Sequence, residues 1–118
     1  MAKAIIVDDS KFMRKIIHET LVEGGHEVIG EADNGVDGLE MYRMMKPDFV
    51  TMDITMLGKD GIETVAEIHS IDPNARIIVI SAMNEKTLRI NDKTINASAF
   101  ITKPFDKKTL LDAVQSIL

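Results

Sequence analysis

The sequence predicts one α/β domain, in which helices cover both faces of a five-stranded parallel sheet. Short apolar runs, each long enough for one buried strand, alternate along the chain with longer amphipathic stretches. The chain has 118 residues, an ordinary length for one domain, and shows no repeat or linker, so we expect a single domain spanning 1–118. Alternation of buried strands and helices is typical of a three-layer, doubly wound arrangement.

Three apolar runs give the clearest strand signals. They are Ala4-Ile5-Ile6-Val7, Phe49-Val50-Thr51-Met52 and Ile77-Ile78-Val79-Ile80. Their residues are apolar or β-branched throughout, as expected of parallel strands buried on both faces. Weaker strand signals lie at 27–29 and 99–102.

Four amphipathic stretches between and after these runs predict helices. Their apolar faces are Met13, Ile16, Ile17, Thr20 and Leu21, ended by Gly24-Gly25; Val36, Leu39 and Tyr42, ended by Pro47; Ile62, Val65 and Ile68, ended before Pro73; and Leu110, Leu111, Val114, Ile117 and Leu118. Residues 85–95 should form a further helix by position, but their apolar face is poor. Gly30 and Gly35 are expected to be turn residues.

Composition excludes several classes of protein. The chain has no cysteine, so a disulfide framework, a thiolate metal site and a cysteine nucleophile are all excluded. The net charge is −5 with scattered lysines and arginines, which argues against a nucleic-acid surface. No apolar run approaches the roughly 18 residues of a membrane span, and no signal peptide precedes the first strand. We therefore expect a cytoplasmic protein.

Polar side chains follow four of the five predicted strands. Asp8 and Asp9 follow the first, Asp53 the third, Ser81 the fourth and Lys103 the fifth. Because ligands of such sheets bind at the carboxyl ends of the strands, we expect these side chains to converge there. Taken singly, each has a simpler explanation, such as a helix cap at Asp8-Asp9, a turn at Ser81 or a solvated lysine. Their joint occurrence favours a site.

The chemistry of this set points to phosphoryl transfer. Three clustered carboxylates repel one another, and oxygen ligands without histidine or cysteine suit Mg²⁺. A carboxylate can act as a nucleophile towards phosphorus, a reaction that needs mainly positioning and neutralisation of charge. Lys103 would supply a positive charge, and Ser81 a hydrogen-bond donor.

Five segments of the chain resemble the receiver-domain family of two-component response regulators, and most closely its single-domain chemotaxis members. They are Ile6-Val7-Asp8-Asp9-Ser10, 30–35 (GEADNG), 46–54 (KPDFVTMDI), Val79-Ile80-Ser81-Ala82 and 100–105 (FITKPF). The resemblance covers the whole chain and implies a flavodoxin-like (βα)5 fold with strand order 2-1-3-4-5.

The resemblance also implies a role for each matched residue. Asp53 would be the phosphoacceptor. The metal ligands for Mg²⁺ would be Asp8 (largely through water), Asp9, Asp53 and the backbone carbonyl of Thr55. Ser81 and Lys103 would contact the phosphoryl oxygens, Phe100 would be the switch residue that follows Ser81, and the Lys103-Pro104 bond would be cis.

As a family member the chain would be a signalling switch rather than an enzyme, assisting only its own phosphorylation and dephosphorylation. The implied partners are a sensor histidine kinase, a downstream motor, switch or adaptor protein, and a phosphatase, with the receiver itself monomeric. Chemotaxis or motility is the expected process, and the alternative is a stand-alone receiver in another phosphorelay.

Two other classes of function fit the sequence less well. An FMN module would need a glycine- and hydroxyl-rich phosphate loop after the first strand, where this chain has Asp8-Asp9-Ser10. A phosphatase with an aspartyl nucleophile usually has a second Asp two residues after the nucleophile, whereas here Asp8 is followed by Ser10 at that spacing.

The chain departs from the receiver pattern at two places. In the loop after Asp53, Leu57 replaces the usual proline. On the expected output surface, the segment 91–96 (NDKTIN) is unusually polar.

Overall fold

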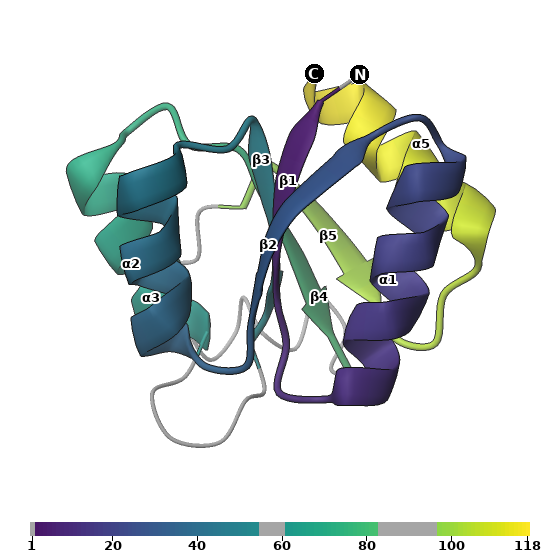
Figure 1. The fold of residues 1–118 in the computed structure, drawn as a ribbon, viewed down its shortest axis with the longest axis horizontal. Coiled ribbons are helices and arrows are strands. Elements are labelled where there is room, and N and C mark those ends of the chain that lie inside the picture. Colours follow the sequence, from purple (N-terminus) through teal and green to yellow (C-terminus); the bar gives the residue numbers. More distant parts are fainter. Residues whose placement is uncertain (1, 55–60, 83–96) are drawn as a thin grey trace.

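The computed structural model describes residues 2–54, 61–82 and 97–118, in which strands and helices alternate (Figure 1). The elements are β1 (Lys3–Val7), α1 (Lys11–Glu23), β2 (Glu27–Ala32), α2 (Gly35–Met45), β3 (Phe49–Asp53), α3 (Gly61–Ile71), β4 (Ile77–Ser81), β5 (Ala99–Thr102) and α5 (Lys107–Ile117). All strands pair in parallel in one sheet, in the order β2-β1-β3-β4-β5. The predicted fold class and strand order are confirmed.

Alternation along the strands divides the core between the two faces of the sheet. Ile5, Val50 and Val79 point into a cluster with α2 and α3, whereas their neighbours Ile6 and Ile78 point into a second cluster with α1 and α5. Figure 1 shows these two pairs of helices on opposite sides of the sheet. The three layers follow from strands that are apolar on both faces.

The helix ends follow local signals in the sequence. Ser10 caps α1, with its hydroxyl accepting a hydrogen bond from the Met13 amide at 3.1 Å. α2 ends at Lys46, which has a left-handed φ of 47° immediately before Pro47, as predicted for the end of this helix. Asp106 caps α5 in the same way as Ser10 caps α1.

The buried face of α2 differs from the prediction. Val36 was expected to face the core, but its side chain is 59% exposed. The buried positions are Gly35, Gly38 and Tyr42. A Cβ atom at Gly38 would lie 2.9 Å from a methyl group of Val7, so α2 approaches the sheet closely through its glycines.

Gly30 lies within β2 and not in a turn, and Gly35 is the first residue of α2, so the expectation of turn residues was wrong for both. The pairing of β1 with β2 shifts register between Ala4 and Ile5, which pair with Val28 and Gly30. A Cβ at position 30 would overlap the Met41 sulfur, so a larger residue in this irregular stretch of β2 would require the methionine side chains of α2 to shift.

Three expectations concern residues outside those that the structure describes: the further helix at 85–95, the polar segment 91–96 and the loop that contains Leu57. Among the described residues, no helix has both the length and the apolar character needed to cross a membrane.

Candidate metal centre and acceptor carboxylate

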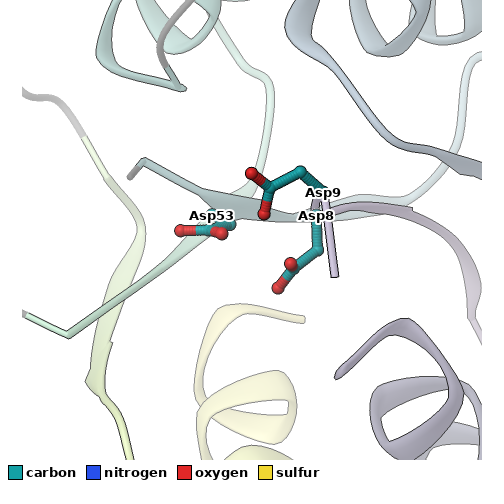
Figure 2. A group of neighbouring side chains, drawn as sticks. All are labelled: Asp8, Asp9 and Asp53. Carbon is teal, nitrogen blue, oxygen red and sulfur yellow. The ribbon is translucent and has the colours of Figure 1, made fainter. Parts of the chain in front are cut away.

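Three carboxylates gather at the carboxyl ends of β1 and β3 (Figure 2). Each of Asp8, Asp9 and Asp53 offers one oxygen within 4.8 Å of the oxygens of the others. Asp8 and Asp53 are buried, with 1% and 3% of their surface exposed, and Asp9 is exposed. The pocket therefore combines two buried acids with one that solvent can reach.

The backbone after β1 fixes Asp8. Its amide donates to the Ala32 carbonyl at 3.0 Å, which continues the pairing with β2 by one residue. Its carboxylate accepts a hydrogen bond from the Ser10 amide at 2.8 Å. Because the α1 cap is the Ser10 side chain, capping does not account for the two aspartates, and the simpler explanation for Asp8-Asp9 is wrong.

Asp53 is the last residue of β3, whereas the sequence predicted that it would follow the strand. Its neighbours in the sheet are β1 and β4, and it pairs in register with Ile80. The first residue of α3, Gly61, lies against its backbone: a Cβ there would overlap the Asp53 carbonyl oxygen and lie 2.9 Å from the carbonyl carbon. α3 therefore supports the acceptor strand by direct backbone contact.

Lys103 brings a positive charge to two of the acids. Its Nζ lies 3.4 Å from Asp8 Oδ2 and 3.6 Å from Asp53 Oδ2, and only 20% of the side chain is exposed. The Lys103 amide donates to the Ser81 carbonyl at 2.7 Å, so the end of β4 fixes the backbone of Lys103 just after β5. The Lys103-Pro104 bond is cis, as the resemblance implied.

The charge in the pocket is not balanced by Lys103 alone. Burial raises the pKa of the Asp8 carboxyl, the Ser10 amide opposes this shift, repulsion from Asp53 raises the pKa further, and Lys103 lowers it. Three carboxylates lie together, and Lys103 forms ion pairs with Asp8 and Asp53, so an added cation would relieve their repulsion. Hard oxygen donors with one solvent-accessible member fit a Mg²⁺ ion that keeps several waters.

The two predicted switch residues share one face of the sheet. Phe100 packs against the cluster beneath α2 and α3, and Ser81 alternates onto the same side of β4 as Val79. Val79 and Phe100 pair in register, and Ser81 is fully buried. The predicted Thr55 ligand lies outside the residues that the structure describes.

Sequence reasoning missed two residues beside the cluster. The guanidinium of Arg14 donates to the Asp8 carbonyl at 2.7 Å, and Gly61 contacts Asp53 as described above. Gly61 carried no specific signal, because glycine is accepted at helix starts and Gly35 begins α2 in the same way. Arg14 carried none either, because it resembles any other basic residue on an amphipathic helix.

The sequence profile of the response regulator receiver domain matches residues 4–115. The chain belongs to the response regulator receiver family. The match includes every predicted site residue, from Asp8 to Lys103. This receiver is a homologue of phosphoacceptor signalling proteins rather than of metabolic enzymes.

Relatives of this receiver include several chemotaxis proteins. It is 44% identical to the chemotaxis protein CheY of Thermotoga maritima, covering 98% of this chain and 96% of the relative. It is 45% identical to CheY of Bacillus subtilis, covering 98% and 97%.

Two similar solved structures hold Mg²⁺ and a beryllium fluoride. The CheX–CheY–BeF3–Mg²⁺ complex of Borrelia burgdorferi has a TM-score of 0.91 and 35% identity, covering 98% of this receiver and 87% of the similar chain. The response regulator TrrA of Thermotoga maritima, in complex with Mg²⁺-BeF, has a TM-score of 0.91 and 30% identity, covering 100% of both chains.

Proposed function

We propose that the whole chain, 1–118, acts as one receiver domain that accepts a phosphoryl group on Asp53 and thereby changes its affinity for a downstream protein. The observation that carries the proposal is the position of Asp53: a buried carboxylate between two further acids and the Lys103 ammonium. Asp53 is proposed as the acceptor because it holds the position that the family resemblance gives to the phosphorylated carboxylate, with Lys103 Nζ 3.6 Å from its Oδ2.

In the proposed reaction an oxygen of Asp53 attacks the phosphorus of a phosphohistidine on a sensor histidine kinase. The new O–P bond forms as the N–P bond breaks, and the imidazole leaves with its electron pair and takes up a proton. Lys103, which already lies within 3.6 Å of the Asp53 carboxylate, would pair with the incoming phosphoryl oxygens. Ser81 would donate a hydrogen bond to one of them.

Mg²⁺ would be held by Asp8, Asp9 and Asp53, with Asp8 largely through water and with the Thr55 carbonyl as a further ligand. When bound it would neutralise the crowded carboxylates and the phosphoryl oxygens. The donor set supports this choice, because it consists of oxygens within 4.8 Å of one another. The Mg²⁺ in the two similar complexes agrees with it.

The output of the switch would pass through Ser81 and Phe100. A phosphoryl group on Asp53 would draw the Ser81 hydroxyl towards it, and Phe100 would fill the space on the same face of the sheet. Because Phe100 is only partly buried, a change of its rotamer would reach the surface beside β5. A partner protein would then bind one state better than the other.

The relatives favour chemotaxis or motility as the process. The proposed partners are a sensor histidine kinase, a motor, switch or adaptor protein and a phosphatase, and one similar CheY is seen in complex with CheX. A phosphorelay outside chemotaxis is the second candidate. TrrA, a response regulator whose name carries no chemotaxis role, resembles the chain over its full length. Soft-agar swarming of a deletion strain would distinguish the two.

The test is to incubate the protein with acetyl phosphate and Mg²⁺ and to map the modified residue by intact mass and peptide analysis. We expect a single phosphoryl group on Asp53, absent in Asp53→Asn and in chelator. Asp33→Asn, which removes an exposed acid outside the cluster, is the matched control and should be modified like the wild type. Modification of Asp53→Asn, or modification that persists in chelator, would refute the proposal.

A further inference from the structure

A chain of contacts links β2 to the acidic cluster through the Arg14 side chain. Arg14 Nη1 donates to the Asp8 carbonyl oxygen at 2.7 Å. Its Nε lies 3.4 Å from Glu31 Oε1, and the other Glu31 oxygen lies 2.8 Å from His18 Nδ1. Only 18% of the Arg14 side chain is exposed, so the guanidinium is held between α1, β2 and the turn after β1.

We propose that Arg14, oriented by Glu31, is a positioning residue that sets the Mg²⁺ affinity of the pocket by fixing the peptide bond between Asp8 and Asp9. This inference rests on the proposed function. The oxygen that Arg14 holds belongs to that peptide group, whose plane determines where the Asp9 side chain begins. Asp8 is anchored on its amide side by Ala32, so Arg14 anchors the opposite side.

The contacts require an arginine in particular. Its planar group reaches two oxygens from two different nitrogens: Nη1 donates to the Asp8 carbonyl in the turn after β1, and Nε pairs with the Glu31 carboxylate on β2 at 3.4 Å. A lysine has one ammonium at the end of a flexible stem and cannot make both contacts with the same geometry. Glu31 fixes the rotation of the guanidinium and also offsets its charge, so the effect of the pair on the pocket is one of geometry.

Electrostatics and positioning predict opposite results for the loss of Arg14. Removing a positive charge beside a carboxylate cluster should strengthen the binding of a cation. Removing a support for Asp9 should weaken it, since loss of groups that orient metal ligands typically costs about 10–100-fold in affinity. A role confined to stability would leave the Mg²⁺ affinity of the folded protein unchanged.

The experiment measures the Mg²⁺ dissociation constant by titration calorimetry and the unfolding midpoint in chelator for each variant. Arg14→Ala and Arg14→Lys should both bind Mg²⁺ more weakly than the wild type, Arg14→Ala by about tenfold. Glu31→Ala should weaken binding in the same direction. Because Glu31 acts through Arg14, the double variant should bind no more weakly than Arg14→Ala.

His18→Ala is the matched control, because His18 contacts the Glu31 carboxylate but not Asp8. The Mg²⁺ affinity of this variant should equal that of the wild type. If Arg14→Ala does not fold, Glu31→Ala decides the question, since Glu31 is a third exposed and on the surface of β2. Unchanged or tighter Mg²⁺ binding in the folded variants would overturn the inference. A wild-type protein that binds no Mg²⁺ would instead overturn the proposed function.

Discussion

Replacing Gly61 by alanine should disturb the acceptor strand more than any other single methyl group added to a helix glycine. The new Cβ would overlap the Asp53 carbonyl oxygen and lie 2.5 Å from the Ile54 Cα. Both obstacles are backbone atoms of a chain segment, and β3 is paired on both sides, to β1 and to β4. Relief therefore requires α3 or the end of β3 to move.

The expected cost follows from two opposing effects. Alanine is better than glycine in a helix by up to about 1 kcal/mol. Overpacking against a rigid surface costs about 1–3 kcal/mol. Since the surface here is backbone, the upper end applies, which leaves a net loss of about 2 kcal/mol and a midpoint lower by about 8 °C for a domain of this size.

Thermal unfolding and the rate of phosphorylation by acetyl phosphate would be measured together. Gly38→Ala is the matched control, because its Cβ would meet side-chain methyl groups of Val7 at 2.9 and 3.1 Å and not the backbone of the acceptor strand. We expect Gly61→Ala to lose both stability and phosphorylation rate, and Gly38→Ala to keep its rate. A Gly61→Ala protein that melts and reacts like the wild type would refute the reasoning.

Three further predictions follow from polar groups that are buried or partly buried. Thr51 is 1% exposed and its hydroxyl has no hydrogen-bond partner among the described residues, so Thr51→Val should raise the free energy of unfolding by about 1 kcal/mol in denaturant titration. A loss of stability would contradict this. His26 Nδ1 accepts from the Ala2 amide at 3.2 Å and burial lowers the pKa of this histidine, so its stabilising effect should be full above about pH 6.5 and disappear as the pH falls through the lowered value. Thermal melts across this range should show a flatter pH dependence for His26→Gln. Burial and a 2.7 Å hydrogen bond to Asp72 raise the pKa of Tyr42, the chain's single tyrosine. The absorbance of its phenolate should therefore appear only above about pH 10, the ordinary value for tyrosine. In Asp72→Asn the phenolate should appear at a lower pH than in the wild type.

The strands and the acidic cluster could be predicted because their signals are local. An apolar run such as Ile77–Ile80 identifies a strand buried on both faces without any knowledge of its neighbours. The rule that sites lie at the carboxyl ends of parallel strands then places Asp8, Asp53 and Lys103 together. In the structure, Lys103 Nζ lies 3.4 Å from a carboxylate oxygen of Asp8 and 3.6 Å from one of Asp53.

The features that escaped prediction depend on close packing. Hydropathy assigns Val36 to the core of α2, but the helix packs through Gly38, a residue without a side chain for any hydropathy pattern to detect. The pairing of Arg14 with Glu31 joins a helix to a strand whose relative placement only the folded chain defines. Gly30 likewise appears as a turn residue until the register shift of β2 is known.

The hydrogen bond from Lys103 to Asp8 joins residues 95 positions apart, and β1 lies inside the sheet although it comes first along the chain. Synthesis from the N-terminus therefore delivers the acids of β1 and β3 well before the ammonium that follows β5. Contacts of such long range form slowly, because the intervening chain must first be ordered. A nascent receiver thus holds the clustered acids that follow β1 and end β3 before Lys103, the ammonium that pairs with Asp8 and Asp53, is synthesised.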